Sequence, residues 1–152
     1  MASEQARVVH LACDFLHSYL TRDGVLIRSD LPYAELTEGN VLTSDAVAGM
    51  LAKLRGRSFN QVLGELPKRD EGFPPDSAGA PMWDAAVDHL KYVHDHGWEA
   101  ARSDQPTHDP QAAFGASLNL VVALTIEFAA ETDKSARQLA RLLRDAAAAE
   151  MR

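Results

Sequence analysis

The stretch AAFGASLNLVVALTIEFAA, residues 112–130, decides the fold. It is apolar on nearly all sides of a helix, which is typical of a helix covered by neighbours rather than one lying on a surface. Its length would also allow it to cross a membrane, but it is diluted by alanine and glycine and interrupted by Ser117, Asn119, Thr125 and Glu127. We therefore expect the central helix of a bundle, or a helix through which two copies of the chain form a homodimer, and no membrane insertion.

The bulk composition is that of one ordinary globular domain. The chain has 152 residues, of which 46% are hydrophobic and 24% charged, close to the averages for globular proteins. A chain of this length can bury a self-sufficient core, so we treat residues 1–152 as a single helical domain. The net charge of −7 argues against a protein that coats nucleic acid or an anionic membrane with its whole surface. The single cysteine, Cys13, and an N-terminus without the pattern of a secretory signal predict a cytoplasmic location.

The rest of the sequence predicts an all-α, single-domain bundle of five or six helices. Apolar residues recur at helical spacing over residues 3–21, 44–55, 58–66, 82–102 and 133–151. Thr43 or Ser44 is the expected N-cap of the second segment. Residues 25–42 lack this spacing and predict a loop with at most a small β-hairpin. Residues 67–81 contain four of the seven prolines and predict a long Pro-rich loop.

The segment DHLKYVHDHGWEA, residues 88–100, is dense in histidine and acidic residues. Its three histidines cannot bind one ion, because at about 100° per residue two of them lie on the opposite side of the helix from His94. His94 instead shares the predicted buried face with Trp83 and Trp98. Two tryptophans and a histidine on one face predict an apolar ligand pocket or partner surface with one polar anchor. The alternative is that all three are ordinary core residues.

A second set of candidate residues lies in the first helix. His10, Asp14 and His17 are spaced i, i+4 and i+7 and therefore share one face. Imidazole and carboxylate groups are suitable ligands for zinc, iron or manganese. The pattern supports an alternative in which the protein is a metal-dependent enzyme. The ordinary interpretation is a solvated polar face, because a metal site would normally recruit a further ligand from a second helix.

The two short helices over residues 44–66 support another alternative, a helix-turn-helix DNA-binding regulator. Arg55 and Arg57 would supply positive charge, and Asn60 and Gln61 could read adenine edges. The spacing of small and apolar residues matches the motif only in part. A plain helical pair with solvated arginines is the other interpretation.

The last helix is strongly amphipathic. The face expected to be buried consists of Leu139, Leu142, Leu143 and Ala146. The opposite stripe is basic and consists of Lys134, Arg137, Arg141 and Arg144. A solvated face explains such a stripe, and a docking surface for an acidic partner or for phosphates is the alternative.

The common motifs of nucleotide-binding proteins, serine hydrolases, redox proteins and metalloproteases do not occur in the sequence. The sequence therefore favours a non-enzymatic binding or regulatory protein over an enzyme, and it implies no particular cofactor. The expected partners are a small molecule or a protein at Trp83, His94 and Trp98, and a second copy of the chain through residues 112–130.

Overall fold

The computed structural model describes residues 4–21, 30–67, 79–99 and 110–151, with the backbone alone for residues 79–82. The regular structure in these ranges is helical throughout. The helices with defined bounds are α1 (Glu4–Thr21), α2 (Tyr33–Arg55), α3 (Phe59–Glu65), α4 (Gly79–His96), α6 (Pro110–Glu131) and α7 (Ala136–Glu150). The predicted all-α bundle is confirmed.

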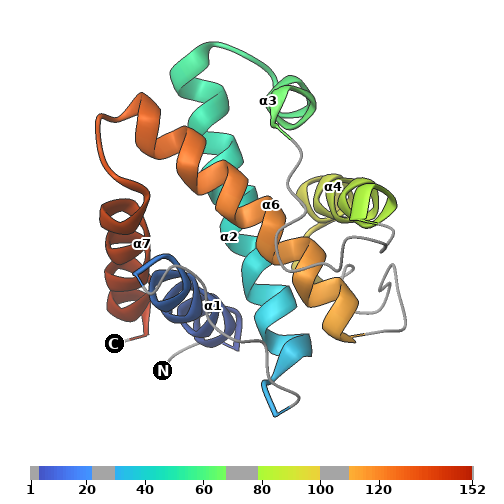
Figure 1. The fold of residues 1–152 in the computed structure, drawn as a ribbon, viewed down its shortest axis with the longest axis vertical. Coiled ribbons are helices and arrows are strands. Elements are labelled where there is room, and N and C mark those ends of the chain that lie inside the picture. The colour runs from blue at the N-terminus through green and yellow to red at the C-terminus, as the bar shows by residue number, and fades with distance from the viewer. Residues whose placement is uncertain (1–3, 22–29, 68–78, 100–109, 152) are drawn as a thin grey trace.

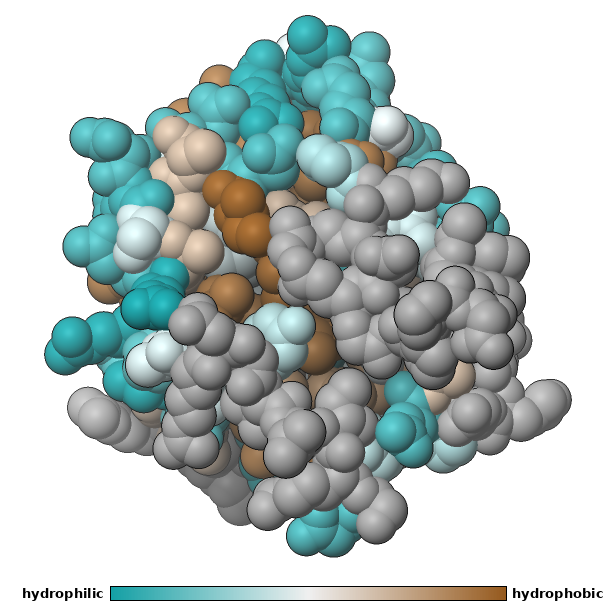
Figure 2. Space-filling view, in the orientation of Figure 1, coloured by the Kyte–Doolittle hydropathy of each residue, from teal (hydrophilic) through white to brown (hydrophobic). Residues whose placement is uncertain are grey.

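Helices α2 and α6 form the centre of the bundle (Figure 1). They run in the same direction, since Asn40 contacts Ser117 and, further along both helices, Arg55 contacts Glu131. Helices α1 and α7 pack against each other on one side of this pair, and α3 and α4 lie on the other side (Figure 1). On the face in Figure 2, apolar side chains gather in the middle and hydrophilic side chains lie at the margins.

Helix α6 is the core helix that the sequence predicts. Every residue from Ala113 to Thr125 is buried. Helix α6 is also long and apolar enough to cross a membrane, but 78% of its most apolar window is buried inside this chain. Its apolar surface is therefore accounted for by intrachain packing. The homodimer stays a prediction, and the buried middle of α6 does not provide a surface for it.

The polar residues of α6 are compatible with burial because their side chains bond to the helix itself. Ser117 Oγ donates to the carbonyl oxygen of Phe114 at 2.8 Å. Thr125 Oγ1 donates in the same way to Val121 at 2.7 Å. Such bonds to a carbonyl three or four residues earlier remove most of the cost of burying a hydroxyl group. These residues therefore do not mark a solvent-facing side of the helix.

Helix α2 begins eleven residues earlier than the sequence predicts, at Tyr33 rather than at Ser44. The predicted cap at Thr43 or Ser44 is wrong, because both residues are buried in the middle of the helix. The predicted loop or hairpin is also wrong over residues 33–42, which are helical, while residues 25–29 lie outside the described part of the chain. The polar residues in this stretch suggested a turn, but Thr37 and Thr43 donate to backbone carbonyls of α2 itself.

Both ends of α4 and one face of α7 differ from the predictions. Helix α4 ends at His96 and not near residue 102, because Gly97 adopts a left-handed conformation with φ of 88°. Helix α4 begins at Gly79, so the last residues of the predicted 67–81 loop are helical; residues 68–78 are not described. In α7, Leu139 is buried as predicted, but Leu142 is 49% exposed and Ala146 is exposed too.

Helices α1 and α2 approach each other closely at Gly39. A Cβ atom on Gly39 would lie 2.1 Å from the carbonyl oxygen of Val8 and 2.5 Å from Cβ of Ala12. The nearest obstacle is backbone, which cannot rotate away as a flexible side chain would. The absence of a side chain at Gly39 therefore sets the distance between the two helices.

We expect Gly39→Ala to lower the free energy of unfolding by about 2 kcal/mol, because the added methyl group forces α1 and α2 apart. Gly49→Ala is the matched control in the same helix, where an added Cβ meets no heavy atom within 4 Å. That variant should raise stability by about 0.5 to 1 kcal/mol, since alanine favours a helix over glycine. Urea denaturation measures both values. An unchanged or raised stability of Gly39→Ala would show that the close approach is not a constraint.

Candidate functional site

The three residues of the predicted ligand pocket do not form one buried group. Trp83 is 3% exposed and belongs to the hydrophobic core. His94 is on the outside, with 43% of its side chain exposed. Trp98 follows Gly97 and so lies beyond the end of α4. The expectation of a common buried face is wrong. Trp83 and His94 lie at similar positions around α4, but His94 is exposed near the end of the helix, and Trp98 lies past Gly97.

His94 joins three helices at the surface. Its Nδ1 lies 2.8 Å from Oδ1 of Asp45 in α2, and its ring stacks on Phe59 in α3 with centroids 3.8 Å apart and planes 6° apart. Because a carboxylate oxygen accepts, Nδ1 of His94 carries the proton and donates. The contacts tie α4 to α2 and α3.

The residues of the predicted metal site are engaged otherwise or stand apart. In the described ranges no three His, Cys, Asp or Glu side chains are grouped so that they could hold a metal ion. Nη1 of Arg144 lies 3.1 Å from Nδ1 of His17, and a guanidinium can only donate. The contact occupies the lone pair of Nδ1 and brings a positive charge to it. Nδ1 of His17 is thus not free to bind a metal ion, and His10 and Asp14 do not belong to any group of described residues that could hold one. The structure therefore gives the metal hypothesis no support.

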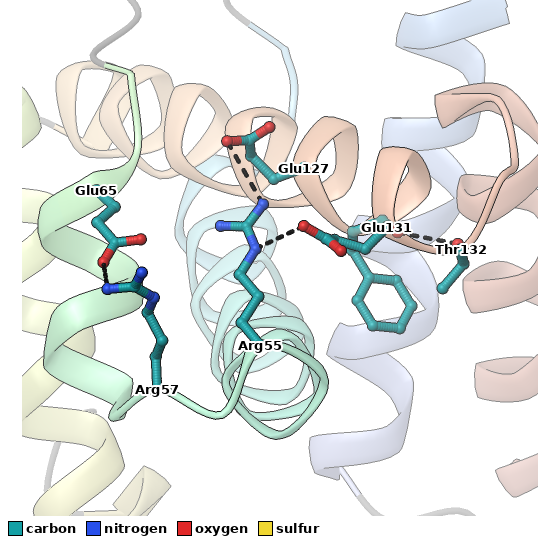
Figure 3. A network of polar contacts seen from close by, with 7 residues as sticks. Arg55, Arg57, Glu65, Glu127, Glu131 and Thr132 are labelled. Carbon is teal, nitrogen blue, oxygen red and sulfur yellow. Dashed lines mark hydrogen bonds and ion pairs between the residues drawn. The ribbon is translucent and has the colours of Figure 1, made fainter.

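The arginines of the predicted helix-turn-helix are paired with acidic side chains (Figure 3). Arg55 Nε lies 2.9 Å from Glu131, and its Nη2 lies 3.8 Å from Glu127. Arg57 forms a similar pair with Glu65 at 2.8 Å. These carboxylates neutralise the charge that would attract phosphates.

The predicted base-reading residues are only partly available. The Gln61 side chain accepts from the backbone N–H of Ser58 at 2.9 Å as part of a capping box that begins α3. Asn60 is exposed. Of the four residues proposed to contact DNA, the two arginines and Gln61 thus have partners within the chain. The geometry favours the plain helical pair.

A small cavity lies between α2, α4 and α6. It holds about 20 Å³ of water-accessible space, room for about one water molecule. Helix α2 contributes Thr37, Val41 and Ser44 to the lining. They are spaced i, i+4 and i+7 and so lie on one face of the helix. The rest of the lining described comes from α4 and α6: Ala85, Ala86, His89, Ala113, Ala116, Ser117 and Leu120. Most of these side chains are small and apolar.

The hydroxyl group of Ser44 distinguishes this cavity from an ordinary packing defect. Ser44 is 1% exposed, and its Oγ has no hydrogen-bond partner among the described residues. By contrast, Thr37 donates to Tyr33 at 2.7 Å, and Ser117 both donates to Phe114 and accepts from Asn40. A buried hydroxyl without a partner costs about 1 to 3 kcal/mol. Ser44 is therefore the best candidate for a functional residue in the described part of the chain.

The sequence did not identify this site for a specific reason. Thr37, Val41 and Ser44 share a face only if residues 33–44 are helical, and their polar character had suggested a loop. The sequence placed His89 on the side of its helix away from the predicted buried face. In the structure His89 is part of the cavity lining. The available signal was the helical spacing of Ala113, Ala116 and Leu120 together with small residues in α4.

No known protein family, curated protein or solved structure matches the chain.

Cys13, the one cysteine of the chain, is buried between α1 and α2. Burial raises the pKa of its thiol, and the contact with Thr43 at 3.5 Å opposes this only in part. The thiolate is the nucleophilic form of cysteine. A catalytic role for Cys13 near neutral pH is therefore disfavoured.

Ser44→Ala should raise the free energy of unfolding by about 1 kcal/mol, because it removes a buried hydroxyl group without a partner. Ser117→Ala, in the same cavity, should lower it by about 1 to 2 kcal/mol, because Asn40 then loses its acceptor. Urea denaturation of both variants measures the two signs. Equal losses of stability would mean that the Ser44 hydroxyl is satisfied after all.

We expect Cys13 to react slowly with a thiol reagent at pH 7 in the native protein and rapidly in denaturant. Because its pKa is raised on folding, the unfolded chain releases the thiol proton more readily. Stability should therefore fall as the pH rises above about 8.5, the ordinary pKa of cysteine. Cys13→Ala should lack this part of the pH dependence. Fast labelling of the native protein would contradict the burial of the thiol.

Proposed function

We propose that this chain is a non-enzymatic binding protein whose small-molecule site is the cavity between α2, α4 and α6. The observation that carries the proposal is the unpartnered, fully buried hydroxyl group of Ser44 in the lining of that cavity. Small-molecule sites are mostly apolar and contain a few polar groups that orient the ligand. The lining described has this character.

A binding role explains why the chain retains an unfavourable group in its core. Buried polar groups without partners are rare in folded proteins, and each one calls for an explanation. Alanine at position 44 would fill the helix position without that cost. A ligand that bonds to Ser44 would recover the lost free energy, so the group would destabilise only the unliganded protein.

Binding is favoured over nucleophilic catalysis by the same hydroxyl group. A serine nucleophile requires a general base within hydrogen-bond reach. Although His89 also lines the cavity, Ser44 Oγ makes no hydrogen bond to it or to any other described residue. The arrangement can hold a ligand, but it lacks an activated nucleophile.

A ligand larger than a water molecule requires the cavity to widen. Helices α2 and α6 are bonded to each other through Asn40 and Ser117 at 3.1 Å, so we expect the widening on the side of α4. The exposed Asp45–His94 contact holds α4 to α2 one residue away from Ser44. Exposed ion pairs contribute only about 0.2 to 1 kcal/mol. Breaking this contact is only part of the cost of moving α4, because Trp83, Leu90 and Val93 of α4 are also packed in the core.

A titration with neutral organic fragments, followed in two-dimensional NMR spectra, tests the proposal. Saturable shifts should appear at Ser44 and at the cavity residues of α4. Ala86→Leu should block binding by filling the cavity, whereas Ala148→Leu in α7, at a position of similar burial, should not. Ala113→Val is a second filling variant in case Ala86→Leu unfolds. Absence of any saturable shift in the parent protein would refute the proposal.

A further inference from the structure

We propose that the ligand of this cavity is a slim, uncharged, mostly aliphatic molecule with a terminal oxygen that accepts a hydrogen bond from Ser44. This inference rests on the proposed function and adds the chemical class of the ligand. It follows from three features of the lining: its charge, its hydrogen-bond inventory and its shape.

The described part of the lining offers an ionic ligand no Lys, Arg, Asp or Glu as a counter-ion. His89 is the one titratable residue among the described lining residues. A charged group taken from water into such a site without a counter-ion carries a large desolvation penalty. We therefore expect a carboxylate, a phosphate or an ammonium group to bind poorly at the described lining, and the proposed ligand is neutral.

The hydrogen-bond inventory sets what the ligand must offer. The proton of Thr37 is used at Tyr33, and the proton of Ser117 is used at Phe114. Ser44 is thus the hydroxyl group of the lining whose proton makes no bond to a described residue. The ligand must supply an acceptor at this point. An alcohol, aldehyde or ketone oxygen is a neutral acceptor of this kind.

The shape of the lining sets the form of the ligand. Thr37 and Ser44 are seven residues apart on α2, which is about 10 Å along the helix axis. The lining from α6 includes the methyl side chains of Ala113 and Ala116. Asn40 and Ser117, bonded at 3.1 Å, hold α2 and α6 together within this stretch.

Because the Asn40–Ser117 bond and the packing of α2 on α6 both oppose separation of these helices, we expect the space to widen towards α4. A narrow, elongated molecule fits such a slot, whereas a branched or bulky one would have to push the helices apart. An unbranched primary alcohol is narrow and elongated, and its hydroxyl oxygen is the hydrogen-bond acceptor that Ser44 requires. We therefore use 1-pentanol as the probe.

The experiment measures the affinity of the full-length protein for 1-pentanol by NMR titration. Pentanoate and pentylammonium should give no saturable shifts, because each would bury a charge. The branched isomer 2,2-dimethyl-1-propanol should bind about tenfold more weakly, because it overpacks the slot. Ser44→Ala should weaken binding of 1-pentanol about three- to tenfold, the loss expected for one hydrogen bond. Ser18→Ala, a serine of α1 outside the lining, is the matched control.

The outcomes separate this inference from the proposed function. If 1-pentanol and xenon, which binds dry apolar cavities, both leave the cavity resonances unshifted, the proposed function itself fails. If 1-pentanol binds at the cavity equally well in Ser44→Ala, or if pentanoate binds as well as the alcohol, the ligand class is wrong and the binding function remains. Discrimination by charge, branching and Ser44 together supports the assignment.

Discussion

The complete burial of α6 from Ala113 to Thr125 is the constraint on which the rest of the structure depends. A helix with no solvent-facing side along its middle must be covered by several neighbours, and every polar group in it must find a partner inside the protein. The chain meets the second requirement with bonds from side chains of α6 to its own carbonyls. It meets the first with α2, α4 and α7, which all pack against α6.

Helix α2 must therefore combine length with small, partly polar side chains on its buried faces. Gly39 lets α1 approach, Asn40 bonds to Ser117 across the interface with α6, and Thr43 bonds within its own helix. Ser44 is the exception, because it is equally buried and makes no such bond. The other buried hydroxyl groups described in this interface have hydrogen-bond partners. Packing alone does not require that the hydroxyl group of Ser44, beside the cavity, lacks one.

The charged side chains that first suggested functions are used to join helices. Arg55 connects the end of α2 to the end of α6 through Glu127 and Glu131 (Figure 3). In α7, Arg137 donates to the carbonyl oxygen of Leu20 at 2.8 Å, and Arg144 contacts His17. Two residues of the basic stripe thus attach α7 to α1. Because these partners lie far away along the chain, the stripe looks like a free surface when the sequence is considered by itself.

The sequence by itself determined the fold class and the central helix, because apolar periodicity and an almost continuous apolar run are local properties that survive without knowledge of partners. The cap of α3 at Ser58 was also predictable, since its capping box involves residues three apart. Only the tertiary structure decided the start of α2, because buried Thr37, Thr43 and Ser44 have the same composition as a polar loop until their environment is known. The cavity likewise required the tertiary structure, since α2, α4 and α6 meet there from three distant parts of the chain. An unsatisfied hydroxyl is a property of its surroundings, and no local pattern records it.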